Sequence, residues 1–437
     1  MGNFMDVHVI FLYNKITRYS INSVLATIDR TENVRVHLVE DVTRLFNYVS
    51  TIRSLGGKCV VAISLLTPML VNDNFYIELR DLVAKLRELS CIVVCGGPHA
   101  TGDPLGTLKF FKFNYVFIGE AEESFREFIL ALRDGGDPSS VKGLAYIDDE
   151  GQFVFTGRRE PVNLDKYDPF PYWRGIFSPI EITRGCPYGC FYCQVSYVHG
   201  FKYRHRGVEK IALYVEEFAK RGGKDIRFIS PDGLAYGSTR SGKEINLGAL
   251  ETLLLSVKNV VEKRGGRIFL GTFPSEVRPE HVTSESLSLL KKYVFNKTII
   301  IGAQSGSESV LKHINRQHSV EEAVNAVEVA IKEGFVPDVD LIIGFPGEST
   351  EDQLSTLLLA KKVVNLGGRV HLHYYIPLPG TPLGLKPPSP VPREIKKELS
   401  RIIGAGKGYG NIFSQEKLSQ KIVELHEKGI IAPKVRS

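Results

Sequence analysis

Two stretches of the chain alternate between short apolar runs and longer amphipathic segments. In the first stretch the apolar runs are rich in β-branched residues, which is typical of buried parallel strands. Helical patterns such as Asn74–Glu88 and Glu122–Arg133 separate these runs. The predicted strands are Val7–Tyr13, Val34–Val39, Cys59–Ser64, Ile92–Cys95 and Tyr115–Ile118. This alternation predicts a doubly wound α/β sheet, which binds ligands beyond the carboxyl ends of its strands.

The second alternating stretch follows a polar break, a predicted β-hairpin and a proline-rich linker. Its predicted strands are Ile180–Thr183, Ile226–Ile229, Ile268–Thr272, Thr298–Ile301, Val339–Ile343 and His371–Ile376. Strands separated by helices in this way predict a partial parallel (β/α)6 barrel. The predicted organisation is an N-terminal domain at 1–140, a hairpin and linker at 141–175, a barrel at 176–385 and a small helical tail at 386–437.

Composition narrows the class of protein only slightly. The chain has 437 residues, 43% hydrophobic and 24% charged, which is ordinary for a globular protein. A net charge of +6 permits an anionic ligand but does not favour nucleic acid as a partner. No apolar run reaches the ~18 residues of a membrane span, and no secretory leader pattern opens the chain. We therefore expect a soluble, cytoplasmic protein.

The strongest local signal is a compact cysteine triplet, Cys186, Cys190 and Cys193, directly after a predicted strand. Thiolates are the usual ligands of iron–sulfur clusters, and three of them on a four-iron cluster leave one iron open. The alternative is a structural zinc site with His199 or His205 as the fourth ligand. Closed zinc sites usually use two separated ligand pairs, so the spacing favours the cluster.

The segment 183–193, TRGCPYGCFYC, resembles the signature of the radical S-adenosylmethionine (SAM) superfamily. In that superfamily the open iron chelates SAM, and one electron cleaves SAM to methionine and a 5′-deoxyadenosyl radical that abstracts hydrogen from a substrate. The resemblance implies a [4Fe–4S] cluster as a metal centre and SAM as a cofactor. It also implies an external electron donor of the flavodoxin or ferredoxin type.

Further motifs at the later strand ends follow the order of that superfamily over about 176–385. They are Ser230–Gly233, Gly271–Glu276, Gln304–Glu308, Asp340–Ser349 and Pro377–Pro382. The resemblance assigns SAM binding to Tyr192, Ser230, Asp232, Glu276, Gln304, Ser305, Arg316, Gly344 and Pro346. Many members carry Gly-Gly-Glu where this chain has Ser-Pro-Asp-Gly. Either Asp232 replaces that glutamate, or backbone carbonyls bind the amino group of SAM.

The N-terminal domain resembles the flavodoxin-like cobalamin-binding domain that precedes many radical SAM barrels. The residues that carry this resemblance are Ser64, Thr67, Gly96, Gly97, Gly119 and Glu120. They imply a cobalamin across the strand ends, with Ser64 and Thr67 on its nucleotide tail. The D-x-H-x-x-G motif of histidine-ligated cobalamin is missing after the first strand, and His99 in its Gly-Gly-Pro-His turn is more simply structural. We therefore expect no histidine on the cobalt.

These motifs predict a cobalamin-dependent radical SAM enzyme that C-methylates an unidentified substrate. The alternative is a SAM-only cyclisation, rearrangement or methylthiolation with a cofactor-free N-terminal domain. A methylthiotransferase would normally add a second cysteine set, whereas Cys59, Cys91 and Cys95 are spread over predicted strands and are expected in the core. A zinc-stabilised nucleotide-binding scaffold is a remote alternative. The segment Gly237–Glu244 nearly matches a phosphate loop but lacks its final hydroxyl, so we expect a mobile active-site loop there.

Overall fold

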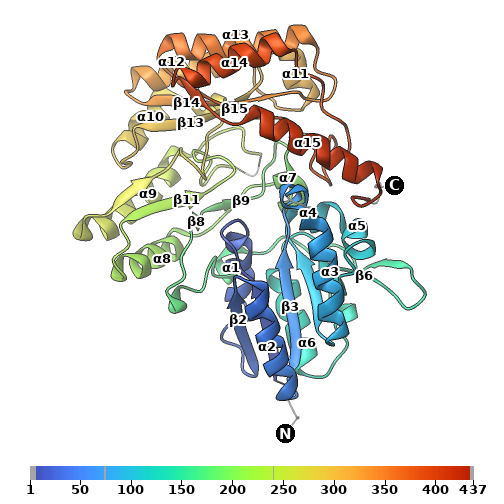
Figure 1. Ribbon diagram of the computed structural model, residues 1–437. Coiled ribbons are helices and arrows are strands. Elements are labelled where there is room, and N and C mark those ends of the chain that lie inside the picture. The colour runs from blue at the N-terminus through green and yellow to red at the C-terminus, as the bar shows by residue number, and fades with distance from the viewer. Residues whose placement is uncertain (1–5, 73–74, 240, 434–437) are drawn as a thin grey trace. The chain divides into compact units, whose positions relative to one another are not determined.

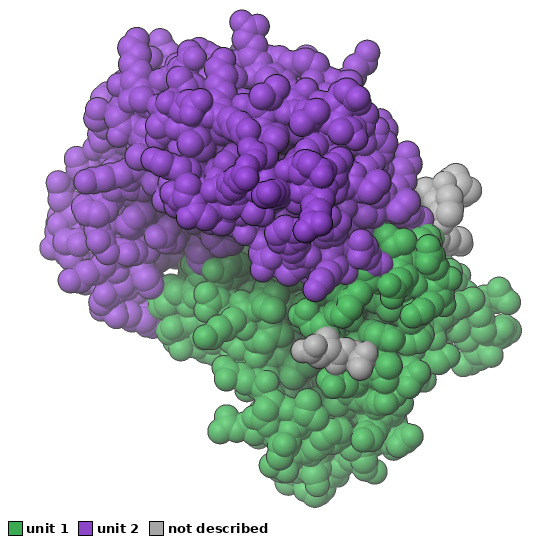
Figure 2. Space-filling view, turned by 45° about the horizontal axis from the view of Figure 1, so that its top comes forward, with its two compact units in different colours: residues 1–178, 378–381, 421–437 green, residues 179–377, 382–420 purple. Residues whose placement is uncertain are grey.

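The structure is a computed structural model that describes residues 6–72, 75–239 and 241–433. It divides into two compact units, which Figure 2 colours separately. Unit 1 comprises residues 1–178, 378–381 and 421–437. Unit 2 comprises residues 179–377 and 382–420. The chain therefore leaves unit 1 after Ser178 and returns to it twice.

Unit 1 is built on one sheet with the strand order β2-β1-β3-β4-β5-β6-β7. The strands are β1 (Val7–Leu12), β2 (Val34–Val39), β3 (Lys58–Ser64), β4 (Ile92–Gly96), β5 (Tyr115–Phe117), β6 (Leu144–Ile147) and β7 (Phe153–Phe155). Strands β1 to β5 are parallel, whereas β6 and β7 are antiparallel additions. The order of the parallel strands is that of flavodoxin-like folds, which confirms the predicted doubly wound sheet.

The helices of unit 1 connect successive strands of this sheet. They are α1 (Arg18–Ala26), α2 (Val42–Ser54), α3 (Phe75–Glu88), α4 (Pro98–Gly102), α5 (Pro104–Lys109) and α6 (Glu122–Arg133), with single 3-10 turns at Thr67–Val71, Pro138–Ser140, Leu164–Lys166 and Tyr172–Arg174. Alternate residues of β1 and one face of α1 and α6 form a single apolar core. In this core Phe117 meets the edges of Phe125 and Phe128, with ring centroids 5.2 and 5.5 Å apart.

The hairpin and linker differ from the predicted boundaries. The hairpin joins the sheet of unit 1 because Val116 and Phe117 of β5 pair with β6. The linker is tied to the turn after α1, since the side chains of Trp173 and Arg174 donate to the carboxylate of Asp29 at 2.5 and 2.8 Å. The segment predicted as a separate connection is therefore part of unit 1, and the boundary moves to Ser178.

Unit 2 contains two parallel sheets, with the orders β12-β11-β8 and β13-β14-β15-β16, and a small antiparallel pair, β10-β9. Its strands are β8 (Ile180–Glu181), β9 (Thr183–Arg184), β10 (Arg204–His205), β11 (Asp225–Ile229), β12 (Arg267–Phe269), β13 (Thr298–Gln304), β14 (Val336–Ile343), β15 (Arg369–Tyr374) and β16 (Gly408–Tyr409). A bridge to Ile301 of β13 is made by Val277, in the segment that follows β12. These parallel sheets and the helices between their strands confirm the predicted partial barrel.

Helices connect and follow the barrel strands, and the last of them runs on into unit 1. They are α7 (Gln194–His199), α8 (Val208–Lys220), α9 (Leu247–Val261), α10 (Ser284–Lys291), α11 (Glu308–His313), α12 (Val320–Lys332), α13 (Thr350–Leu366), α14 (Arg393–Gly404) and α15 (Ile412–Glu427), with 3-10 turns at Glu262–Arg264 and Pro279–His281. Val339, Leu341 and Ile343 of β14 pack under α12 and α13. Because strand side chains alternate, Asp338 and Asp340 face the barrel interior instead.

The C-terminal segment, which the sequence predicts to be a small helical tail, contributes to both units. Strand β16 extends the barrel sheet by pairing with β15, and α14 lies beside α13 over the orange strands of Figure 1. Beyond Gln420 the chain belongs to unit 1, where the buried carboxylate of Asp103 accepts the backbone N–H of Gly106 at 2.9 Å and of Ala432 at 3.2 Å. Within the described part of the chain, every helix is too short or too polar to cross a lipid bilayer.

Candidate active site

The three clustered cysteines lie on the loop between β9 and α7. The loop starts at Gly185, whose φ of +80° favours glycine and where a side chain would clash with the carbonyl of Lys202. The backbone of Cys186 is held from both sides, because its N–H donates to Gly200 at 3.1 Å and its carbonyl accepts the Ser196 hydroxyl at 2.8 Å. The sequence therefore fixes a tight loop around the sulfur atoms.

The spacing of the sulfur atoms separates the two metal hypotheses. A tetrahedral zinc with Zn–S bonds of about 2.3 Å would bring its thiolates to about 3.8 Å from one another. Among the described residues, neither the three cysteines nor a set that adds His199 or His205 brings its ligand atoms within 4.8 Å of one another. Both ring nitrogens of His205 already contact Thr183 and Ser238, at 3.0 and 3.2 Å. The wider spacing fits a four-iron cluster.

The burial of the cysteines bears on the protonation of their thiols. Burial raises the pKa of the Cys193 thiol to about 12, and it raises the pKa of Cys186 as well. Without a metal these groups would be neutral thiols at pH 7. Ligand thiolates are deprotonated by the ion that they bind, so the site fits a cationic iron cluster held by Cys186, Cys190 and Cys193.

Arg316 places a positive charge beside this site. Its Nη1 atom lies 3.7 Å from the sulfur of Cys190, and its Nη2 donates to the carbonyl of Gly302 at 2.6 Å. Its Nε lies 3.1 Å from Nε2 of His318. Burial and the charge of Arg316 lower the pKa of His318 to about 3, so this histidine is neutral and accepts the hydrogen bond. The guanidinium is thereby held in one orientation toward Cys190.

A second arginine supports the first one. Arg278 is buried, donates from Nη2 to the backbone carbonyl of Arg316 at 2.6 Å and pairs with Glu280. Its guanidinium carbon lies 3.4 Å from the centre of the Tyr188 ring. Two of these partners, Arg316 and Tyr188, are distant in the sequence, so no local pattern indicates the role of Arg278.

Asp232 is engaged within the protein. Its side chain is fully buried, with Oδ2 2.5 Å from Nδ1 of His281 and Oδ1 accepting the N–H of Leu234 at 3.1 Å. Ser230 is also turned inward, since its hydroxyl donates to the carbonyl of Asp232 at 2.6 Å. These contacts favour the alternative in which backbone carbonyls, rather than the Asp232 carboxylate, bind the amino group of SAM. His281 was not identified from the sequence.

The segment after β14 forms a wall next to the cysteine loop. The ring of Tyr192 meets Phe345 edge-on, with centroids 5.4 Å apart. Gly344 has a φ of +87°, and Pro346 is buried beside it. The carboxylate of Glu348 closes this turn by accepting the N–H of Gly344 at 2.6 Å and of Phe345 at 3.1 Å. Burial raises the pKa of Glu348 to about 7.

The remaining predicted SAM residues take different positions. Gln304 ends β13 with a φ of +72°, an uncommon conformation for a residue other than glycine. Ser305 points away from the barrel interior, with its hydroxyl 3.1 Å from that of Thr356 on α13. Burial raises the pKa of Glu276, and the charge of Asp340 adds to this shift. Their assignments to SAM stay predictions.

The loop that nearly matches a phosphate loop packs beside the cysteine segment. The carbonyl of Gly242 accepts the hydroxyl of Tyr188 at 2.9 Å. Gly242 also has a φ of +72°, and a side chain there would approach Pro187 and Tyr203. Arg240 lies outside the described residues. This packing agrees with a loop at the active site, and its predicted mobility stays a prediction.

The predicted cobalamin residues gather at the carboxyl edge of β3, β4 and β5. Ser64 and Gly96 end β3 and β4, and Gly97, with a φ of +96°, follows directly. The N–H of Gly119 donates to the Thr101 hydroxyl at 3.0 Å, while Glu120 accepts the N–H of Val162 at 2.9 Å. Thr67 begins a 3-10 turn after β3. The fold thus brings together turns that are up to 56 positions apart in the sequence.

His99 is fully buried at this edge. Its Nδ1 lies 3.0 Å from the hydroxyl of Thr67, and its Nε2 lies 3.9 Å from the carboxylate of Asp103. Burial lowers its pKa to about 4, so the imidazole is neutral at pH 7. Nε2 has no hydrogen-bond partner among the described residues, and the expectation that no histidine binds cobalt stays a prediction.

The other three cysteines are core residues, as predicted. Cys59, Cys91 and Cys95 are all buried on or beside β3 and β4. Among the described residues, none of these cysteines belongs to a group of three or more side chains that could hold a metal ion. The structure therefore shows no second cysteine set of the kind expected in a methylthiotransferase, within the residues described.

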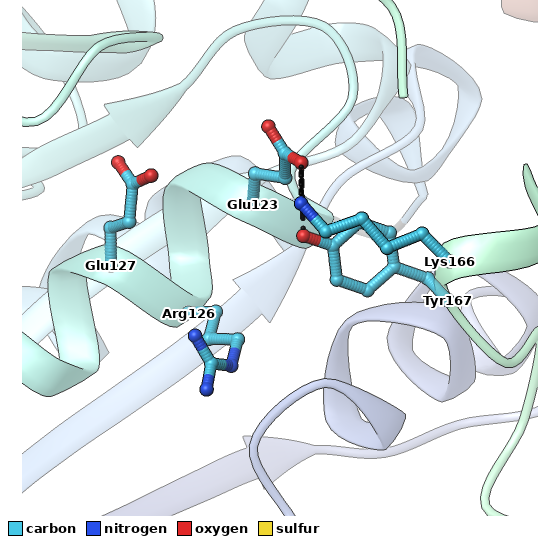
Figure 3. A pocket seen from close by; sticks show the side chains of 5 residues that line it. All are labelled: Glu123, Arg126, Glu127, Lys166 and Tyr167. Atoms are coloured by element: carbon cyan, nitrogen blue, oxygen red, sulfur yellow. Dashed lines mark hydrogen bonds and ion pairs between the residues drawn. The ribbon is translucent and has the colours of Figure 1, made fainter. Parts of the chain in front are cut away.

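A pocket of about 410 Å³ lies elsewhere on unit 1. Figure 3 shows its lining residues, Glu123, Arg126, Glu127, Lys166 and Tyr167. Glu123 accepts hydrogen bonds from Lys166 at 2.7 Å and from Tyr167 at 3.0 Å, which lower its pKa. These charges mostly satisfy one another at the surface, so we assign the pocket no chemistry.

Comparisons with known proteins identify the family. The model of the radical SAM superfamily matches residues 180–360. A tRNA-2-methylthio-N(6)-dimethylallyladenosine synthase from Anaplasma phagocytophilum (strain HZ) is 30% identical over 365 residues, which cover 82% of this chain and 76% of that protein. This chain belongs to the radical SAM superfamily. It is therefore a radical SAM enzyme, whose family uses a [4Fe–4S] cluster and SAM.

Other relatives match shorter parts. The corresponding synthase from Ehrlichia canis (strain Jake) is 33% identical over 256 residues, 55% of each protein. A protein of Pyrococcus horikoshii described as an uncharacterized methyltransferase is 26% identical over 301 residues, 64% of this chain and 60% of that one. The chain spans about half the length of several curated relatives that it matches.

Two solved structures share the fold over most of the chain. The radical SAM methyltransferase TsrM from Kitasatospora setae, with cobalamin and a [4Fe–4S] cluster bound, has a TM-score of 0.67 at 16% identity and covers 88% of this chain and 74% of its own. The cobalamin-dependent radical SAM enzyme OxsB has a TM-score of 0.61 at 16% identity and covers 81% of this chain and 51% of its own. At this identity they show a common fold, which confirms the predicted architecture.

Proposed function

We propose that this radical SAM enzyme depends on cobalamin and methylates a carbon atom of a substrate that is not yet identified. The observation that supports the proposal most strongly is that one chain contains two folds. A barrel with a cluster-binding cysteine loop is joined to a parallel sheet of flavodoxin-like order whose glycine and polar turns gather at its carboxyl edge. TsrM and OxsB, which share this fold, are described as cobalamin-bound radical SAM proteins.

The chain supplies residues for each cofactor. Cys186, Cys190 and Cys193 would hold the cluster, which together with SAM supplies a 5′-deoxyadenosyl radical. Arg316 holds positive charge beside Cys190, and the Tyr192–Phe345 wall excludes water from one side. At the edge of unit 1, cobalamin would be held by Ser64, Thr67, Gly96, Gly97, Gly119 and Glu120. A flavodoxin or ferredoxin would donate the electron.

The decisive experiment for cobalamin uses the purified full-length chain under anaerobic conditions. The protein is mixed with hydroxocobalamin, desalted and examined by absorption spectroscopy. We expect about one cobalamin to stay bound per chain, and the same amount in the C186A/C190A/C193A variant, because the predicted cobalamin residues lie in unit 1 and the cysteines in unit 2. Loss of all cobalamin on desalting from the wild type would refute cobalamin dependence.

Methyl transfer is tested separately from binding. Protein loaded with both cofactors is incubated with SAM that carries a deuterated methyl group and with an extract of the source organism, and products are sought by mass spectrometry. A product that contains the deuterated methyl group on carbon supports methylation. A product that forms without any label transfer would instead favour the SAM-only reactions.

Methylthiolation is a second candidate because several sequence relatives are described as tRNA methylthiotransferases. Against it stands the burial of Cys59, Cys91 and Cys95 apart from any third ligand among the described residues. The two reactions differ in iron content. A methylthiotransferase with a second cluster would retain iron in the C186A/C190A/C193A variant, whereas the proposed enzyme would lose it.

A further inference from the structure

The barrel interior contains a compact group of two histidines and an aspartate outside the cysteine site. Asp340 lies on β14, and His371 and His373 lie two positions apart on the neighbouring β15. The strands run in parallel with Asp340 opposite His371, so all three side chains project from the same face of the sheet. The opposite faces of β14 and β15 are packed under helices.

Three atoms of these side chains converge on one point. Oδ1 of Asp340 lies 2.9 Å from Nδ1 of His371 and 3.8 Å from Nε2 of His373, and the two nitrogens are 3.0 Å apart. With metal–ligand bonds of about 2.1 Å, adjacent ligands lie about 3.0 Å apart at right angles and about 3.4 Å apart at the tetrahedral angle. The observed triangle has the size of one face of such a coordination shell.

Hydrogen bonds among these three residues cannot satisfy all three of the converging atoms at once. Nδ1 of His371 has two close partners, and the three distances set these partners about 80° apart as seen from Nδ1. A proton on that atom that points to Asp340 therefore points away from His373. A cation at the centre of the triangle would be reached by a lone pair from each of the three atoms.

Neighbouring side chains orient the two histidines. The ring of Tyr409 stacks on His371, with centroids 4.2 Å apart and 17° between the planes. The amide of Gln415 lies 3.4 Å from Nδ1 of His373. The side chains of Asp340 and both histidines are 16–29% exposed, so a bound ion would be partly open to a ligand.

Asp338, two positions before Asp340, is paired with Arg369 at 2.6 Å. Among the described residues, the ion-pair partners of Asp340 are the two histidines themselves. A divalent cation bound by all three side chains would supply the positive charge that balances the Asp340 carboxylate.

From this geometry we propose that Asp340, His371 and His373 bind a divalent transition-metal ion, zinc being the ion that fits best. Imidazole and carboxylate ligands suit zinc and its neighbours rather than magnesium or calcium, which prefer oxygen. Three protein ligands are the set of an open zinc site, whose fourth position takes water or a substrate atom. Zinc has no redox chemistry, so it would be unchanged by single-electron transfer in the same barrel. The open position would bind an electron-pair donor of the substrate.

The test measures zinc and iron by elemental analysis in four forms of the full-length protein. Each is reconstituted anaerobically with iron and sulfide, supplied with zinc chloride and desalted. We expect about one zinc in the wild type, none in H371A/H373A and about one in C186A/C190A/C193A, whose iron should be lost. H313A is the matched control, because His313 is an exposed histidine of the same unit, and it should keep both metals.

Two results would overturn the proposal. One is a zinc content in H371A/H373A equal to that of the wild type, and the other is a wild type that retains iron but no zinc. Iron in the histidine variant reports that unit 2 is folded. If this variant does not fold, cobalt(II) titration of C186A/C190A/C193A decides, because four-coordinate cobalt absorbs in the visible range. No such absorption would refute the site. None of these readouts requires cobalamin or methylation.

Discussion

Arg316 offers a quantitative test of how the protein tunes the cluster site. Replacing it by glutamine removes a charge whose Nη1 lies 3.7 Å from the sulfur of Cys190. At that distance two unit charges interact by about 4 kcal/mol with an effective dielectric constant near 20. An added electron is shared over the whole cluster and lies further away on average, so we take about half of this, roughly 2 kcal/mol. For a one-electron couple that corresponds to about 85 mV.

We therefore expect the reduction potential of the cluster to fall by about 85 mV in R316Q, because the reduced state loses a stabilising positive charge. R316K keeps the charge but loses the planar contacts to Gly302 and His318, and it should change the potential much less. The measurement is a redox titration of the reconstituted protein followed by electron paramagnetic resonance. An unchanged potential in R316Q, or an equal shift in R316K, would refute the electrostatic role of Arg316.

Three further predictions concern stability and SAM binding. The pKa of Glu348 is raised to about 7 by burial, so the folded state holds this proton more tightly than the unfolded state does; stability should fall by up to roughly 3 kcal/mol as the pH rises from about 4.5 to 7. E348Q should remove this part of the pH dependence in urea unfolding, and an unchanged profile would contradict the assignment. D232N should lower the free energy of unfolding by about 3 kcal/mol, because it breaks the buried contact with His281. The dissociation constant of SAM, measured by calorimetry, should change less than about threefold. A tenfold weakening would mean that Asp232 binds SAM directly. F128A should lower the free energy of unfolding by about 3–5 kcal/mol, because it leaves a cavity in the core of unit 1. F155A, at an exposed position, should change that free energy by no more than about 0.5 kcal/mol. Equal losses in the two variants would show that the core is assigned wrongly.

The sequence predicted the sheet of unit 1 closely because its strands are continuous β-branched runs. Strand β2 has the predicted bounds, Val34–Val39. Where the pattern is interrupted, the prediction falls short. Strand β14 begins at Val336, three positions before the predicted start, because Pro337 and Asp338 have the composition of a turn. Strand β16 has only two residues and forms because β15 offers it a partner, so no local pattern indicates it.

The candidate site shows the same division between local and long-range information. The cysteine loop is contiguous, so its spacing favours an iron–sulfur cluster, and the resemblance of segment 183–193 to the radical SAM signature adds the cleavage of SAM. His281 is 49 positions from its partner Asp232, and only the folded barrel brings the two together. His371 and His373 share one face of β15, but their meeting with Asp340 depends on the register of β14 against β15. Register between parallel strands that a helix separates is not encoded in either strand by itself.

The most direct test of the central claim is the cleavage of SAM by the purified enzyme. The wild-type protein is reconstituted anaerobically, reduced with dithionite and incubated with SAM, and 5′-deoxyadenosine is measured by liquid chromatography and mass spectrometry. We predict that 5′-deoxyadenosine forms with the wild type only when dithionite is present, and that none forms with C186A/C190A/C193A. Continued formation by this variant, or none by a wild type with a full cluster, would contradict the assignment of Cys186, Cys190 and Cys193 as ligands of a SAM-cleaving cluster.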